Sequence, residues 1–259
     1  MRVAGLATCR ILDEVCAAAV AGVTTRQLDE IARAGIAKAG AISSFLGYGS
    51  GMGLPPYPGV TCISVNDRVV HGIPDDRVLV DGDLVSIDFG VSIEGWHGDS
   101  ARTVEIGAVP EIKHALNEAT RRALWDAIAV VAGGCHVGDI GYAVEKSLGR
   151  RWRVVKSYTG HGIGTAMHME PDVPNYGRPG RGPKLLPGMC VAIEPIVTAG
   201  RGDVTNLEDE WTVVTRDRQP AAHWEHTVAI MPAGVWVLTA ADGGAAELGA
   251  RGVAVEPVG

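Results

Sequence analysis

Asp88 and Asp99 lie eleven residues apart in the stretch VSIDFGVSIEGWHGDSAR, residues 85–102. The runs around them alternate in polarity with a period of two, as β-strands do, and Glu94 and Gly95 between them suit a turn. A hairpin folded there places the two carboxylates roughly opposite each other on one face. Like charges across two strands destabilise a sheet, so either water solvates this face or a cation lies between the carboxylates.

Three further residues favour the cation. His161 is flanked by glycines, and Glu194 and Glu225 lie within apolar, strand-like runs. A carboxylate buried in a strand is costly unless it is paired or bound to a metal. Arg102, one nearby positive charge, cannot balance four carboxylates, whereas two divalent ions would. Oxygen ligands with one imidazole suit Mn, Fe, Co or Zn, and two such ions could lower the pKa of a shared water, as in two-metal hydrolysis.

Two more histidines, His71 and His168, share this setting, because His71 precedes the hairpin and His168 follows His161 by seven residues. The other five histidines are interpreted as structural or solvated: His97, His114, His136, His223 and His226. The sequence has no HExxH, GxSxG or paired-cysteine zinc pattern, so the commoner hydrolase motifs do not compete.

Length and composition limit the remaining classes. The chain has 259 residues, a hydrophobic content of 46% and a formal net charge of −7, which suits one large domain or two small ones. Without a basic block, nothing indicates a nucleic-acid or membrane surface. Five scattered cysteines without a CxxC pair indicate reduced thiols. No apolar run could span a bilayer and no signal peptide is evident, so a cytoplasmic protein is expected.

Helices and antiparallel strands must position these residues. Predicted helices span residues 2–20, 24–39 (with a capping box of Thr24 and Gln27), 110–134 (ended by Gly133 and Gly134) and 139–149 (capped by Asp139). Besides the hairpin, predicted strands cover about 60–65, 152–158, 189–198, 210–215, 223–231 and 235–239. Residues 47–59 are interpreted as a mobile Gly/Pro-rich surface loop, and the tail at 241–259 is expected to fray in part.

A weak internal repeat links residues 22–28 and 134–140. In both, a helix ends near a glycine, extended residues follow and a capped helix begins. This pattern suggests two halves, each with two helices and strands, packed as one domain. Strands interleaved with helices and antiparallel hairpins indicate an α+β fold.

A set of motifs extends these arguments to a family. They are VNDRVVHGIP at residues 65–74, DGDLVSID at 81–88, HGDS at 97–100, GHGIG at 160–164, IEP at 193–195 and EHTV at 225–228. In this order they resemble the methionine aminopeptidases over residues 2–240. Type II members carry an inserted segment between the His and Glu motifs. Because His161 and Glu194 are only 33 positions apart, the type I form is favoured.

The resemblance implies the pita-bread fold, with two pseudo-symmetric halves around a curved antiparallel sheet, and a single catalytic domain at residues 1–259. It implies an enzyme that removes the initiator methionine when the second residue is small. The implied metal ligands are Asp88, Asp99, His161, Glu194 and Glu225. Asp99 and Glu225 would bridge both ions, Asp88 would hold one, and His161 with Glu194 the other. The free amine of the substrate would bind one metal, which explains why only the first residue is removed.

The resemblance also implies roles for single residues. Glu194 would be the general base, His168 would hold the scissile carbonyl and its oxyanion, and His71 would contact the peptide beyond the cut bond and assist proton transfer. The implied methionine pocket is lined by Cys62, Tyr57, Tyr48 and Trp211, with Met167 where many relatives have an aromatic residue. The loop at 49–56 looks longer than in compact relatives, which affects the shape of this pocket.

The implied cofactor is two divalent ions (Co, Mn, Fe, Ni or Zn), and the implied partners are nascent polypeptide N-termini near the ribosome exit. A monomer with no nucleic-acid partner of its own is expected. Two alternatives stay open. One is a proline-specific relative on the same fold, aminopeptidase P or prolidase, although these carry an additional N-terminal domain. The other is a non-catalytic pita-bread protein that binds a peptide, a nucleic acid or a protein partner.

Overall fold

The computed structural model describes residues 1–132 and 134–258, and its centre is a long hairpin. Strands β4 (Leu84–Ile93) and β5 (Trp96–Glu105) pair along ten positions. Glu94 and Gly95 connect them with φ values of 52° and 78°, the left-handed conformation that a two-residue hairpin turn requires. The predicted turn is therefore confirmed. Asp99 pairs with Gly90 rather than with Asp88, so the two carboxylates lie diagonally on one face.

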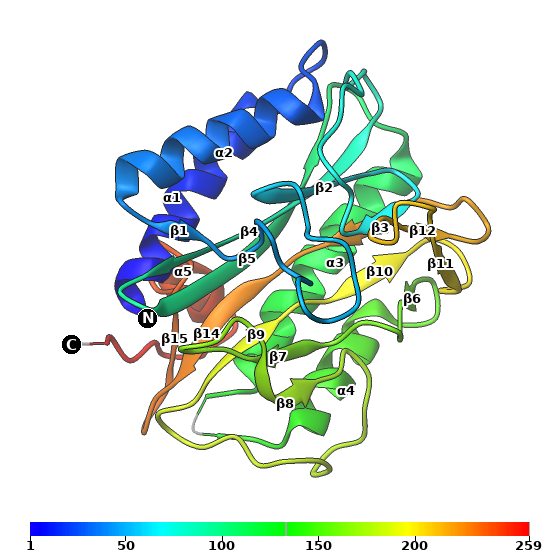
Figure 1. Ribbon diagram of the computed structural model, residues 1–259. Helices are drawn as coiled ribbons and strands as arrows, with labels where there is room; N and C mark the ends of the chain where they lie inside the picture. Colours follow the sequence, from blue (N-terminus) through cyan, green and yellow to red (C-terminus); the bar gives the residue numbers. More distant parts are fainter. Residues whose placement is uncertain (133, 259) are drawn as a thin grey trace.

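Short antiparallel sheets surround the hairpin (Figure 1). β1 (Ile42–Ser43) and β2 (Thr61–Val65) both pair with β4. The largest neighbouring sheet has the order β15 (Val235–Val237), β14 (His226–Ile230), β9 (Cys190–Ile193), β7 (Gly160–Gly162) and β8 (Met169–Val173). Two three-stranded sheets complete the set: β13 (Ala221–His223), β10 (Ile196–Thr198) and β6 (Arg153–Val154), and β11 (Val204–Asn206), β12 (Val213–Thr215) and β3 (Arg68–Val70).

Two helix pairs cover the strands from different sides (Figure 1). α1 (Arg2–Ala18) and α2 (Thr25–Ala39) pack with the N-terminal strands, and α3 (Glu111–Ala129) and α4 (Val137–Leu148) pack with the C-terminal ones. Each pair has its own apolar core, one containing Leu12 and Phe89, the other Leu116 and Ile140. This arrangement agrees with the two halves that the repeat suggested. No helix in the described ranges is long and apolar enough to cross a membrane.

Several predicted boundaries are confirmed and others are wrong. The capping box of Thr24 and Gln27 opens α2 as predicted. In α4 the cap is His136, not Asp139, whose carboxylate accepts the His136 N–H at 2.8 Å from the first turn. Asp suits either position, because both face free backbone N–H groups. Gly133, expected to help end α3, lies outside the described residues.

The predicted strands at 189–198 and 223–231 are each interrupted. Glu194 lies between β9 and β10, and Glu225 lies between β13 and β14. Pro195 follows Glu194 and cannot donate to a ladder. Both carboxylates therefore stand where the ladder is broken rather than inside a continuous strand.

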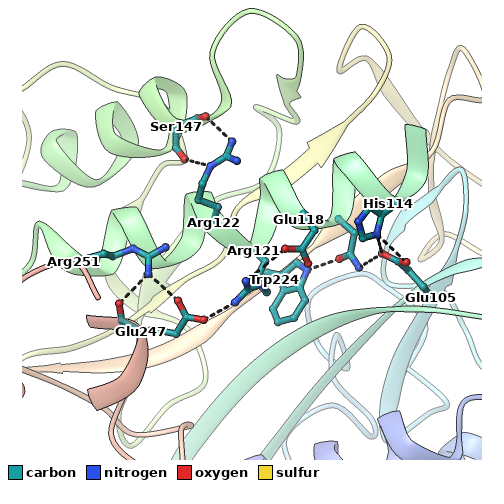
Figure 2. Close-up of polar contacts among 10 residues, drawn as sticks. Glu105, His114, Glu118, Arg121, Arg122, Ser147, Trp224, Glu247 and Arg251 are labelled. Atoms are coloured by element: carbon teal, nitrogen blue, oxygen red, sulfur yellow. Dashed lines mark hydrogen bonds and ion pairs between the residues drawn. The ribbon is translucent and has the colours of Figure 1, made fainter. Parts of the chain in front are cut away.

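Much of the C-terminal tail, predicted from the sequence to fray in part, is attached to the fold. It forms helix α5 (Ala245–Gly249), whose Leu248 is fully buried in the C-terminal core. Arg251 forms ion pairs with Asp126 and Glu247, at 2.8 Å and 2.7 Å, and Figure 2 shows Glu247 bridging Arg251 and Arg121. Long-range contacts of this kind leave little trace in a Gly/Ala-rich sequence.

Candidate metal centre

The hairpin and the C-terminal sheets bring three predicted ligands together. Asp99 on β5, His161 on β7 and Glu225 each offer one ligand atom, and these atoms lie within 4.8 Å of one another. All three residues are buried. His161 Nδ1 lies 2.9 Å from the Gly162 carbonyl oxygen, so this nitrogen carries the proton and the lone pair of Nε2 faces the carboxylates. That arrangement is usual for a histidine that binds a metal.

Glu194 and Asp88 complete the cluster. The Oε1 atom of Glu194 lies 3.6 Å from His161 Nε2, and Asp99 Oδ2 lies 3.8 Å from the same nitrogen. Asp88 shares the face of the hairpin that carries Asp99. The structure thus brings all five predicted ligands to one place, although Asp88 and Glu194 lie outside the tightest group.

The cluster is strongly acidic, and Arg102, the cation expected near it, lies elsewhere. Burial, followed by the neighbouring carboxylates, raises the pKa of Asp88 and Glu225 well above their ordinary values. Arg102 lies on the opposite face of β5 and donates to Asp13 on α1 at 2.7 Å. The sequence-based expectation that Arg102 lies near the acids is therefore wrong, because alternation along the strand turns it away.

Several buried oxygens in this cluster fit a cation. In the described part of the chain, Asp88 Oδ1, Asp99 Oδ1 and Glu225 Oε1 have no hydrogen-bond partner. Buried carboxylate oxygens are normally satisfied by donors or by metals. The chemistry of this donor set, four carboxylates and one imidazole, suits divalent ions of intermediate hardness.

Substituting Asp99 should change how the metal-free protein responds to pH. Burial raises the pKa of Asp99 to about 7, from an ordinary value of 3.8. The folded state then keeps a proton that the unfolded chain loses, so its stability falls as pH rises from 4 to 7. D99N has no such proton. With chelator present, its melting temperature relative to wild type should rise across this window, and a constant difference would contradict the assignment.

An apolar cavity of about 330 Å³ opens directly beside the cluster. Its lining includes six residues predicted to bind substrate: Tyr48, Tyr57, Cys62, His71, His168 and Trp211. Two of the acids, Asp88 and Glu194, also line it. Met167 is buried and packs in the same apolar cluster as Tyr57 and Cys62, rather than on the cavity lining.

Two predicted histidines lie on this lining. The Nδ1 atom of His168 lies 2.7 Å from the Tyr48 hydroxyl, and its ring centroid lies 4.3 Å from that of His161. His71 packs edge-on against Tyr158 and Trp211. His71 has a φ of 57°, which is rare outside glycine and is common in strained functional sites.

The loop at 49–56, part of the segment predicted to be a mobile surface loop, forms part of the cavity wall. Leu54 lines the cavity, and Trp211 Nε1 donates to the Pro55 carbonyl at 2.9 Å. Phe45, Tyr158 and Thr159 are further lining residues that sequence reasoning missed. A surface loop that closes over an apolar site keeps the Gly/Pro composition of an ordinary loop, so composition alone could not identify it.

His223 is a further residue near the acids that the sequence did not single out. Predicted to be structural or solvated, it is buried, and its Nε2 lies 3.7 Å from Glu194 Oε2. The available signal was its position two residues before Glu225, which places both side chains on one face of an extended segment.

Comparison with known proteins agrees with this geometry. The model of metallopeptidase family M24 matches residues 1–232. The chain belongs to metallopeptidase family M24. Divalent metal ions are therefore implied for the acidic cluster, and the orphaned oxygens described above fit them.

The chain is similar to M24 enzymes from several bacteria. It is 46% identical over 247 residues to methionine aminopeptidase 1 of Mycobacterium tuberculosis, covering 92% of this chain and 91% of that protein. It is 43% identical over 219 residues to methionine aminopeptidase 1 of Bacillus subtilis, covering 84% and 86%.

Solved structures show the same fold. The methionine aminopeptidase of Thermotoga maritima superposes with a TM-score of 0.88 at 37% identity, covering 92% of this chain and 94% of that one. The prolidase of Pyrococcus furiosus has a TM-score of 0.68 at 20% identity, covering 92% and 63%, and shows the fold alone. The predicted α+β pita-bread fold is confirmed.

Proposed function

We propose that this M24 chain is a single-domain aminopeptidase that removes the initiator methionine from nascent polypeptides when the second residue is small. The proposal rests on one cavity whose lining combines carboxylates of the acidic cluster with apolar side chains. Asp88 and Glu194 of the acidic cluster and the apolar side chains of Tyr57, Cys62 and Trp211 line the same space. A methionine side chain placed among these groups has its backbone beside the acids.

Asp88, Asp99, His161, Glu194 and Glu225 are proposed to hold two divalent ions. Co, Mn, Fe, Ni and Zn all suit this donor set, and availability in the cell decides among them. Bound there, such ions would polarise the scissile carbonyl and lower the pKa of a water molecule.

Glu194 is proposed as the general base. Burial raises the pKa of its carboxyl well above the ordinary value, which suits a group that must accept a proton near neutral pH. Its backbone is held in place, because Asn175 Nδ2 donates to the Glu194 carbonyl at 2.8 Å. The carboxylate can thus face the reacting groups while the chain that carries it stays fixed.

His168 and His71 are proposed to act on the peptide. The Tyr48 hydroxyl lies against His168 Nδ1 and orients the ring, which leaves Nε2 free to donate to the oxygen that becomes negative in the transition state. His71 lies on the same lining, where it can contact the peptide beyond the cut bond and pass a proton to the new amine.

The cavity walls suit methionine in particular. Tyr57 and Trp211 stand edge to face, 5.3 Å between ring centroids, and a thioether packs favourably against aromatic edges. Leu54 and Phe45 add apolar surface. The proposed substrates are free N-termini of nascent chains near the ribosome exit, and the chain is proposed to act as a monomer in the cytoplasm.

Three peptides test the proposal. With Mn or Co added, the protein should release methionine from Met-Ala-Ser and should leave Met-Arg-Ser and Ala-Pro-Ser intact. A chelated sample is the control. Cleavage of Ala-Pro-Ser alone would identify a proline-specific enzyme. No cleavage of any peptide, with metal binding demonstrated by calorimetry, would favour a non-catalytic binding protein.

A further inference from the structure

His223 is a buried imidazole to which the proposed mechanism assigns no role. It is 2% exposed, and its Nε2 has no hydrogen-bond partner among the described residues. The polar atom that this nitrogen faces is Glu194 Oε2, at 3.7 Å. A buried polar atom without a partner is uncommon in proteins and usually has a specific reason.

Glu194 lies between two imidazoles, one at each carboxylate oxygen. His161 Nε2 lies 3.6 Å from Oε1, and His223 Nε2 lies 3.7 Å from Oε2. His161 belongs to the metal cluster, whereas His223 lies outside the group formed by Asp99, His161 and Glu225. The two imidazoles thus face different oxygens of the same carboxylate.

The backbone of His223 is fixed from outside the cavity. Its N–H faces Thr103 Oγ1 at 2.9 Å and Ser86 Oγ at 3.2 Å, on the two strands of the central hairpin. Its carbonyl accepts a hydrogen bond from Thr103 at 2.8 Å. In β13 it pairs with Ile196, close to Glu194. These contacts fix the backbone of His223, and the burial of its side chain restricts rotation of the imidazole.

The next residue is anchored as well. Trp224 Nε1 donates to Asn117 Oδ1 on α3 at 2.8 Å, and Asn117 Nδ2 donates to Glu105 at 2.8 Å. Figure 2 shows this chain of contacts running from Trp224 to Glu105 and His114. The segment that carries both His223 and Glu225 is thus held by α3 and β5.

We propose that His223 is a positioning residue for Glu194. Its Nε2–H donates to Glu194 Oε2 and fixes the rotation of the carboxylate, a torsion that is otherwise broad. The present separation exceeds a hydrogen bond, and such contacts tighten once a site is loaded. The inference rests on the proposed function, because it takes Glu194 as the base.

Two variants separate positioning from packing. H223L keeps an apolar side chain of similar size but has no donor, whereas H223Q places an amide N–H near the position of Nε2. With the Co-loaded enzyme and Met-Ala-Ser, H223L should lose about 10- to 100-fold in kcat, the usual effect of an outer-shell partner, with little change in KM. H223Q should recover most of that loss. H136Q, at the cap of α4, is the matched control and should behave as wild type.

A second readout does not depend on turnover. The visible absorption spectrum of bound Co reports the geometry of Glu194, so H223L should change the spectrum and H223Q should restore it. If H223L matches wild type in kcat and spectrum, or if H223Q is as impaired as H223L in both, the proposal is wrong. Should H223L fail to fold, H223N, whose amide is too short to reach Glu194, replaces it. If the wild type cleaves no peptide, the proposed function fails, and the spectra still decide the role of His223.

Discussion

Replacing Glu194 by glutamine is expected to lower kcat on Met-Ala-Ser by about 10³-fold, within the range for loss of a general base. Glutamine has nearly the same shape, so the fold should persist, but it cannot accept a proton and it brings one negative charge fewer to the cluster. The apo-protein should keep or slightly gain stability, because burial and Asp99 both oppose the charge of Glu194. Steady-state kinetics and thermal melting of the same samples measure the two effects.

The matched control is E208Q, which makes the same change at an exposed position and should leave kcat unchanged. Titration with Mn before the assay ensures that weaker metal binding is not mistaken for slower chemistry. If E194Q retains wild-type turnover at saturating metal, Glu194 is not the base.

Metal removal is expected to lower the melting temperature by about 10 °C. A ligand present at about 1,000 times its Kd stabilises the folded state by about 4 kcal/mol, and each kcal/mol shifts the melting temperature of a domain of this size by about 2–4 °C. D99N should lose most of this metal-dependent gain, because Asp99 belongs to the tightest group of ligand atoms.

The effect of D99N on the melting temperature changes sign when metal is added, and this change of sign is the sharper test. In chelator at pH 7.5, D99N should melt at or above the wild type, because one of the mutually repelling buried charges has been removed. In the presence of metal, D99N should melt at a lower temperature than the wild type. D203N, an exposed Asp-to-Asn change, should follow the wild type in both conditions. A melting temperature that chelation leaves unchanged would show that no metal stabilises this site.

The features predictable from the sequence are those encoded locally. Glu94 and Gly95 specify their turn by backbone conformation, and Thr24 with Gln27 specifies the start of α2 by reciprocal hydrogen bonds. Such signals act over a few residues, so they survive without knowledge of the rest of the fold. The grouping of the four acids with His161 came instead from the motifs and their family resemblance.

The features that were missed depend on distant pairing. β7 is Gly-His-Gly, a sequence with no strand signal, and it becomes a strand only because β8 and β9 flank it. Arg102, by contrast, turns away from the acids because it lies three residues after Asp99 on β5, an odd spacing that puts the two side chains on opposite faces. His223 reaches Glu194 because β13 pairs with β10. The spacing between His223 and Glu225 indicates that they share a face, but the contact of His223 with Glu194 depends on this pairing.

The two apolar cores described above give the metal centre a mechanical role. Asp88 and Asp99 come from strands of the N-terminal core, whereas His161, Glu194 and Glu225 come from elements of the C-terminal one. An ion held by both sets, as proposed above, would tie the two halves together. Separating the halves would release the ion, so metal binding should couple the unfolding of the two halves more tightly. Amide hydrogens on β4 and on β9, far apart in sequence, should then exchange in step when metal is bound and independently when it is not.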